Sequence, residues 1–214
     1  MLQLSRRRSM NKYLDLGCGS GELTQFVAQL VNPEEIHSIE ISDAAIEQAS
    51  KFGIRCRKAD LNEESLPYPD NSFDLVTAFE IIEHLWNKDN VLKESFRVTK
   101  PGGFFVLTTP NLLSIMSRFL VLFGYLPMHL NLSFEYEVEK RPFQRGSDLY
   151  GHISLYSAKT LKRHLESVGF HVEAVKGLTS MYMTRSRILA FIDVMCSRRY
   201  SLASNILVVA GKSL

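Results

Sequence analysis

The pattern Glu80-x-x-Glu83-His84 brings two carboxylates and an imidazole together within one short stretch. If the chain is helical here, these side chains at positions i, i+3 and i+4 project to one side. Such a group can hold a divalent cation, Mg²⁺ or Mn²⁺, with His152 across the cleft as the candidate fourth ligand. Without a metal, His84 or His152 can act as a general base, or His84 can simply orient the loop.

A glycine-rich turn is the second feature that could take part in binding or chemistry. Gly17, Gly19 and Gly21 alternate with other residues, and Asp15 stands two positions before the first of them. Glycines suit a tight turn whose backbone must approach a ligand that a Cβ would block. The dinucleotide fingerprint G-x-G-x-x-G needs a glycine at position 22, which holds Glu22. The spacing argues against a dinucleotide, and the plain alternative is a turn that only connects a strand to a helix.

Four acidic residues, Asp15, Glu40, Asp60 and Glu80, stand at the ends of successive predicted strands. Ligands of parallel sheets bind at the carboxyl ends of the strands, so the four are expected along one edge. Glu40 follows Gly19 by 21 residues, and a carboxylate there can accept both ribose hydroxyls of an adenosyl ligand. NAD enzymes use an acid here for the same reason, and a solvated acid at a strand end is the plain alternative.

The segment from Asp15 to Gly21 resembles the first motif of class I S-adenosylmethionine-dependent methyltransferases, the methyltransferase-11 or ubiquinone-biosynthesis-like group. The stretch from Leu66 to Val76 resembles the family's lead-in to its fourth strand. The resemblance implies S-adenosyl-L-methionine as cofactor, with the glycine turn against its amino-acid portion. It also implies that Asp60 contacts the adenine amino group and that the next residue packs on the ring. The implied cofactor-binding residues are Asp15, Gly17, Cys18, Gly19, Gly21, Glu40, Ile41, Asp60, Leu61 and Glu80.

The Glu-x-x-Glu-His pattern is similar to that of metal-assisted O-methyltransferases of ubiquinone biosynthesis and of small-RNA 3′ ends. In those enzymes the metal binds the acceptor oxygens and lowers the pKa of the hydroxyl. Residues 108–111, Thr-Thr-Pro-Asn, also resemble the RNA-modifying group, whereas residues 151–156 lack its aromatic-acidic stretch. The same Glu-His pair occurs in methyltransferases that need no metal, so both readings stay open.

Strand and helix signals alternate around these residues. A strand before the glycine turn leads into a helix with Leu23, Phe26, Val27 and Leu30 on one face. Further strands are expected at 36–41, 54–61 and 104–108, and the turn-containing stretch 66–76 leads into a fourth strand. Helices are expected to begin at Ser42 or Asp43 and at Asn87. Ser157 caps a helix that ends at Gly169, before strands at 170–175 and 205–209. The predicted fold class is α/β: a Rossmann-like, mostly parallel seven-stranded sheet with helices on both faces, an antiparallel last strand and a lid insertion after the fifth strand.

Residues 1–214 are predicted to form a single methyltransferase domain with two insertions, a lid at 112–151 and a second insertion at 178–204. The second contains an apolar helix, residues 188–195, flanked by Arg185, Arg187, Arg198 and Arg199. That helix can line an apolar substrate pocket, lie on a membrane surface or meet a partner chain. Since apolar stripes at helical spacing are usually core, ordinary lid and core pieces are the alternative.

The composition of the chain bears on its binding partners and its cellular location. The chain has 214 residues, 45% of them hydrophobic, and a net charge of +2, which gives no electrostatic case for nucleic acid. The only basic tract, Arg6 to Arg8, is followed by no apolar run, so no secretory leader is predicted. Cys18, Cys56 and Cys196 form neither a disulfide framework nor a zinc motif. A cytoplasmic protein, at most peripheral to a membrane, is expected, with its oligomeric state undetermined.

Methyl transfer from a sulfonium requires mainly that nucleophile, methyl and sulfur be held in line, so no single side chain is obligatory. The predicted function is S-adenosylmethionine-dependent methyl transfer to a small or lipid-like acceptor, at oxygen, with nucleic acid disfavoured as partner. A metal-assisted RNA 2′-O-methyltransferase is the alternative within the class. From other classes, a non-catalytic cofactor-binding partner subunit and an NAD-type oxidoreductase remain, the latter without a recognisable hydride-transfer constellation.

Overall fold

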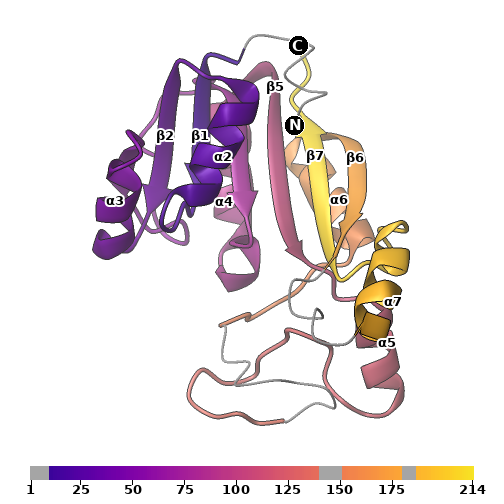
Figure 1. Ribbon diagram of the computed structural model, residues 1–214. Coiled ribbons are helices and arrows are strands. Elements are labelled where there is room, and N and C mark those ends of the chain that lie inside the picture. The colour runs from indigo at the N-terminus through magenta and orange to yellow at the C-terminus, as the bar shows by residue number, and fades with distance from the viewer. Residues whose placement is uncertain (1–9, 140–150, 180–186) are drawn as a thin grey trace.

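Seven strands form one sheet in the computed structural model, which describes residues 10–139, 151–179 and 187–214 (Figure 1). The strand order is β3-β2-β1-β4-β5-β7-β6. β1 to β5 pair in parallel, and β7 runs antiparallel to both of its neighbours, β5 and β6. This confirms the predicted mostly parallel sheet with an antiparallel last strand. The strands are β1 (Lys12–Leu16), β2 (Glu35–Glu40), β3 (Arg55–Lys58), β4 (Phe73–Phe79), β5 (Thr99–Pro110), β6 (His171–Leu178) and β7 (Asn205–Gly211).

Helices cover both faces of the sheet because successive strand residues point to opposite sides. On one face Tyr13 and Leu75 pack with Val27 and Val31 of α2 (Glu22–Val31). On the other face, side chains of β1, β4 and β5 meet α4 (Lys88–Val98) and α6 (Ala158–Val168) in the largest hydrophobic cluster. A smaller cluster lies under α3 (Asp43–Ser50).

The predicted apolar face of the first helix was partly wrong. Leu23 and Phe26 are exposed, and the buried face of α2 instead carries Thr24 together with Val27. The reason is a hydrogen bond: the Thr24 hydroxyl donates to the carboxylate of Asp15 in β1, which turns the helix so that this residue faces the sheet. The buried face of α2 thus combines this polar contact with the aliphatic side chains of Val27, Ala28 and Val31.

The helix-capping predictions were confirmed. The Asn87 side chain accepts a hydrogen bond from Asn90 N at 3.2 Å at the start of α4. Ser157 accepts from Thr160 N at 3.2 Å in a capping box that begins α6, and Gly169 ends that helix in a left-handed conformation.

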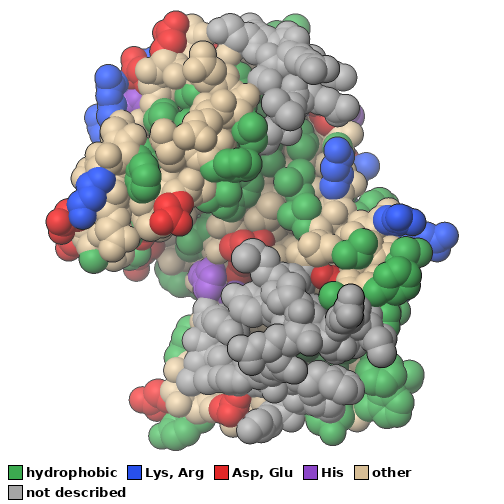
Figure 2. All heavy atoms as spheres, viewed as in Figure 1, with side chains coloured by type: hydrophobic (Ala, Val, Ile, Leu, Met, Phe, Trp, Pro, Cys, Tyr) green, Lys and Arg blue, Asp and Glu red, His purple; other side chains and the backbone are tan. Residues whose placement is uncertain are grey.

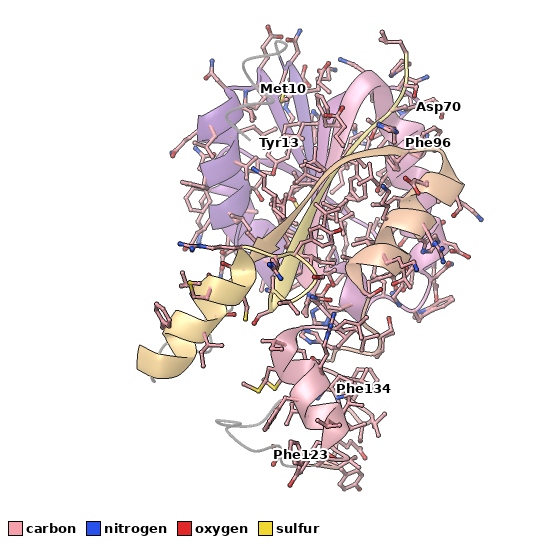
Figure 3. All side chains as sticks on the ribbon, turned by 90° about the vertical axis from the view of Figure 1, so that its right-hand side faces the viewer. Met10, Tyr13, Asp70, Phe96, Phe123 and Phe134 are labelled. Atoms are coloured by element: carbon pink, nitrogen blue, oxygen red, sulfur yellow. The ribbon has the colours of Figure 1, made fainter. Side chains whose placement is uncertain are left out.

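The parallel strands end toward the lower part of Figure 1, where residues 112–139 form an extension below the sheet. This extension begins with α5 (Ile115–Leu122), and α7 (Arg187–Ser197) leads into β7 at the same end. Figure 3 shows Phe123 and Phe134 in this lower part, far from Met10 and Tyr13 in the sheet-bearing part. No helix in the described ranges has the length and apolarity needed to cross a bilayer. The Arg6 to Arg8 tract, Arg185 and residues 140–150 of the predicted lid lie outside those ranges.

Candidate functional site

The glycine turn and Glu40 form one hydrogen-bonded unit at the carboxyl edge of the sheet. The Glu40 carboxylate accepts three backbone N–H groups: Gly19 N at 2.9 Å on Oε2, and Ile41 N and Ser42 N at 2.8 and 3.0 Å on Oε1. Gly17 N donates to a β2 carbonyl at 2.8 Å. The carboxylate is therefore oriented before any ligand binds, and Oε2 keeps lone-pair capacity for a ribose hydroxyl.

The glycines of the turn have different roles. Gly21 has a φ of 86°, and a Cβ there would lie 2.9 Å from both Ala49 Cα and Ile54 Cδ1, so this glycine is needed for packing. Gly19 has a φ of 52°, and a Cβ on it would meet no described atom within 4 Å. The backbone at Gly19 thus borders open space beside Glu40, a cradle that a Cβ would partly fill.

Asp15 lies inside β1, buried beneath the turn. Its carboxylate accepts hydrogen bonds from the hydroxyls of Thr24 and of Thr77, the latter at 2.5 Å, and the Tyr13 hydroxyl is 2.8 Å from Thr77 Oγ1. Burial, opposed by these hydroxyls, raises the pKa of Asp15 to about 6. The sequence did not identify the two threonines, because nothing in their spacing connects positions 24 and 77.

Replacing Asp15 with asparagine tests this burial through stability. The folded-state pKa of about 6 exceeds the usual 3.8, so the folded protein binds the Asp15 proton more tightly, and its stability falls as pH rises through that window. Between pH 4 and pH 7 the free energy of unfolding should shift in favour of the asparagine variant by at most about 3 kcal/mol. Urea denaturation at the two pH values measures this, with the exposed Asp43→Asn as control. Parallel pH profiles for all three proteins would contradict the assignment.

The residues implied for adenine binding lie beside Glu40 with different exposure. Ile41 follows β2 with 56% of its surface exposed, whereas Leu61 is 7% exposed within the largest cluster. Asp60 follows β3, and its carboxylate accepts from Asn62 N at 2.8 Å. The Cys18 side chain is buried in the cluster under α3. Ile41 therefore offers an apolar surface for a ring, while Leu61 and Cys18 present little side-chain surface to a ligand.

The segment after β4 lies directly beside the glycine turn, since a Cβ on Gly17 would be 2.8 Å from Ile81 Cδ1. The condition that the chain is helical through the Glu-x-x-Glu-His pattern is not met. Glu80 has a left-handed φ of 51°, which excludes it from a helix, and a short 3₁₀ turn covers only Ile82–His84. The Glu80 carboxylate lies 3.4 Å from Asn205 Nδ2.

Three of the four predicted metal ligands come together. One ligand atom each from Glu83, His84 and His152 lies within 4.8 Å of the others, and Glu80 is not part of this group. Glu83 is fully buried: its Oε2 accepts from Thr109 Oγ1 at 3.0 Å, and Oε1 has no hydrogen-bond partner among the described residues. Burial, reinforced by the Glu80 carboxylate, raises the pKa of Glu83 to about 8. An unpaired buried oxygen beside two imidazoles fits a proton donor, a cation or a polar ligand group.

Burial shifts both histidines toward their neutral form. Burial lowers the pKa of His152 to about 4, with help from His84 and His129, and burial also lowers the pKa of His84. The His84 and His152 ring centroids are 4.7 Å apart. His152 Nδ1 lies 3.0 Å from the His129 carbonyl oxygen, which can only accept, so the ring donates from Nδ1 and keeps a lone pair on Nε2.

Backbone hydrogen bonds on both sides of His152 hold it at this place. Ile153 N donates to the Glu83 carbonyl at 3.0 Å, and Asn131 N donates to the His152 carbonyl at 3.1 Å. Figure 2 shows histidine and acidic side chains exposed at the junction between the sheet-bearing part and the lower part. His129 was missed from the sequence, because a single histidine in an apolar loop carries no spacing signal.

Comparison with known proteins shows which proteins the chain is similar to. A family model described as a methyltransferase domain matches residues 2–175. The 27-O-demethylrifamycin SV methyltransferase of Amycolatopsis mediterranei is 35% identical over 105 residues, 45% of this chain and 37% of that protein. The ubiquinone/menaquinone biosynthesis C-methyltransferase UbiE of Pasteurella multocida is 35% identical over 103 residues, 45% of this chain and 38% of that protein. The matched region thus spans less than half of these relatives.

A solved S-adenosylmethionine-dependent methyltransferase from Mesorhizobium loti has the same fold. It superposes with a TM-score of 0.65 at 19% identity, covering 98% of this chain and 94% of that one. At this identity the likeness concerns the fold alone.

Proposed function

The chain belongs to the class I S-adenosylmethionine-dependent methyltransferases, and from this we propose that it transfers a methyl group to an oxygen of a small or lipid-like acceptor. The observation that carries the proposal is the contact between two half-sites. The glycine turn with Glu40 forms one, and the neutral pair His84 and His152 forms the other, joined where Ile81 lies against Gly17. Residues 1–214 act as one domain, with insertions 112–151 and 178–204 shaping the acceptor side.

The cofactor half holds S-adenosylmethionine, whose sulfonium supplies an activated methyl with a neutral leaving group. The Glu40 carboxylate accepts from the ribose, and the open backbone at Gly19 allows the cofactor to approach. Ile41 packs on the adenine, with Asp60 toward its amino group. Asp15 acts indirectly, since its bonds to Thr24 and Thr77 hold β1, α2 and β4 around the turn.

The acceptor half must orient an oxygen and take its proton. His152 Nε2 carries the lone pair, and His84 stands beside it, its pKa also lowered by burial. A neutral imidazole within reach of a hydroxyl can serve as its general base. Phe134, although 71% exposed, lies next to Gly151 and His84 and offers apolar surface there, since a Cβ on Gly151 would lie 3.5 Å from Phe134 Cε1 and 3.7 Å from His84 Nδ1. An apolar acceptor with one hydroxyl matches these surroundings.

A metal-assisted reaction is the second candidate, favoured by the unpaired Glu83 Oε1 beside two neutral imidazoles. Glu83, His84 and His152 would hold Mg²⁺ or Mn²⁺, which would supply Lewis acidity toward an acceptor oxygen. This candidate includes an RNA ribose hydroxyl as acceptor, although the chain's net charge of +2 offers little attraction for RNA.

Methyl transfer itself is tested by incubating the protein with isotopically labelled S-adenosylmethionine and a cell extract, followed by mass spectrometry of labelled products. A labelled lipid-soluble O-methyl product is expected. Tight binding of S-adenosylhomocysteine without any labelled product would indicate a non-catalytic partner subunit. Tight binding of NAD alone in calorimetry would overturn the methyltransferase proposal.

Calorimetric titration with MnCl₂ separates the two roles of the histidine cluster. If the cluster holds a metal, the protein should bind Mn²⁺, and Glu83→Gln or His152→Ala should weaken binding roughly 10- to 100-fold or more. Methylation would then stop in EDTA. His171→Ala, an exposed histidine on β6, is the control that should change nothing. Full activity in EDTA together with a large loss in His152→Ala would instead assign His152 as the base.

A further inference from the structure

The helix α7 buries an acidic side chain and exposes apolar ones, the reverse of an ordinary surface helix. Its one acidic residue, Asp193, is buried and accepts a hydrogen bond from Ser204 Oγ at 2.6 Å. Among the side chains of this helix that the structure describes, those from residue 190 on, Phe191 is 65% exposed, and Val194 and Met195 are also exposed. Surface helices normally face the core with their apolar stripe. The polar contact anchors α7 and leaves its apolar side unpartnered within the described structure.

The helix α5 repeats this arrangement. Ser114 and Ser117 are buried with their hydroxyls 2.9 Å apart, and Met128 N donates to Ser117 Oγ at 3.2 Å. Outward lie Phe119 and Leu122, the latter 79% exposed. Ser117 and Leu120 hold α5 against the protein, while Phe119 and Leu122 face away from it.

The two helices belong to one end of the molecule. Ile115 N, in the first turn of α5, donates to Leu202 O at 3.0 Å, and Arg118 Nη2 donates to Ser201 O at 3.0 Å. Both acceptors lie in the turn between α7 and β7. Figure 1 shows α5 and α7 together at the lower end, and Figure 3 confirms that both project below the sheet. We call their outward residues the α5–α7 surface: Ile115, Arg118, Phe119, Leu122, Phe123, Phe191, Ile192, Val194, Met195, Arg198 and Arg199.

The charge on this surface has one sign. Arg118, Arg198 and Arg199 are exposed, whereas Asp193, the only acid in either helix, is buried. In Figure 2, Lys or Arg side chains stand beside the hydrophobic side chains over α7, and the acidic side chains of the lower part lie at its opposite side. Aromatic and aliphatic side chains rimmed by arginines match an anionic lipid interface.

We propose that the α5–α7 surface docks on an anionic lipid bilayer, with the apolar side chains entering the interface and the arginines contacting lipid phosphates. A second copy of the chain fits less well, because a symmetric contact would set the arginines of both copies against one another. The role of this docking rests on the proposed function: it would place residues His84 and His152 next to an acceptor dissolved in the membrane.

Vesicle flotation tests the docking without any methyl acceptor. The full chain should float with vesicles of phosphatidylcholine and phosphatidylglycerol, much less with phosphatidylcholine alone, and less as salt is raised. The double variant Arg198→Gln/Arg199→Gln should bind roughly 25-fold more weakly, given about fivefold for each arginine. Phe119→Ser/Phe191→Ser should weaken binding at least about tenfold, since two aromatic side chains leave the interface.

Matched variants elsewhere serve as controls. Lys159→Gln/Arg163→Gln on α6 makes the same charge change, and Phe26→Ser removes an exposed aromatic from α2. Both should float like the parent, and all variants should keep the parent melting temperature and affinity for S-adenosylhomocysteine. An equal loss of vesicle binding in the control variants, or no flotation of the parent chain, would overturn the proposal. So would a parent dimer, seen by sedimentation, that Phe119→Ser/Phe191→Ser dissociates.

Flotation and methyl transfer fail independently. A chain that floats as described but yields no methylated product would retain the docking surface and lose the proposed function. A chain that methylates a water-soluble acceptor and never floats would retain the function and lose the docking surface.

Discussion

Replacing Glu40 with glutamine is expected to weaken S-adenosylhomocysteine binding roughly 1000-fold, about 4 kcal/mol, because both a charged acceptor and the shape of the turn are lost. In the parent, Oε2 accepts from Gly19 N and Oε1 accepts from Ile41 N and Ser42 N. A glutamine has one oxygen, so its NH₂ must face an N–H donor in either orientation. The turn must therefore move away, and the ribose loses its charged partner.

Isothermal titration calorimetry with S-adenosylhomocysteine measures this change. The control is Glu47→Gln on the exposed side of α3, which removes the same charge from a carboxylate that makes no contact with the turn. Circular dichroism melts should show both variants folded. An affinity of Glu40→Gln within tenfold of the parent would mean that Glu40 does not hold the cofactor.

The second large expected effect concerns the glycine turn, where Gly21→Ala should mainly lower stability and Gly19→Ala should mainly lower cofactor affinity. Gly21→Ala should destabilise the fold by about 4 kcal/mol, since its Cβ would overlap the Ala49 backbone and the residue keeps a left-handed φ. Gly19→Ala should cost only about 1 to 2 kcal/mol of stability, because its Cβ meets open space. It should nevertheless lose S-adenosylhomocysteine binding by roughly 1000-fold, since the methyl group would occupy the cofactor's position.

Gly53→Ala is the matched control for this pair. Gly53 also has a left-handed φ, 75°, and open space around its Cβ, but it follows α3 away from the turn. It should show the same modest stability loss as Gly19→Ala in urea denaturation and full cofactor affinity in calorimetry. If Gly19→Ala also binds normally, the open space at Gly19 is not where the cofactor lies.

Much of the fold was predictable because its signals are local. The alternation of strands and helices, the glycine turn, the Ser157 cap and the Gly169 stop each depend on residues a few positions apart, and each was confirmed. The carboxyl-edge placement of Glu40 followed from the parallel topology, since β1, β2 and β4 end together. Whether the residues at that edge bind the cofactor stays a prediction.

Other features depended on contacts between distant residues. The buried face of α2 follows the Thr24 bond to Asp15 rather than the apolar stripe through Leu23 and Phe26. The Glu-x-x-Glu-His segment is interrupted by the left-handed Glu80, and Glu83 and His84 lie close to His152, which is 68 residues or more away in the chain. No spacing rule links positions so far apart.

The order of elements, their caps and the glycine turn could be read from the chain alone, since neighbouring side chains and backbone sterics impose them. Which carboxyl groups have a raised pKa, which histidines meet and which side of α5 and α7 faces outward depended on folding. Those outcomes arise from burial and from hydrogen bonds between separate segments, as between Asp193 and Ser204, whose desolvation energies exist only once the segments come together.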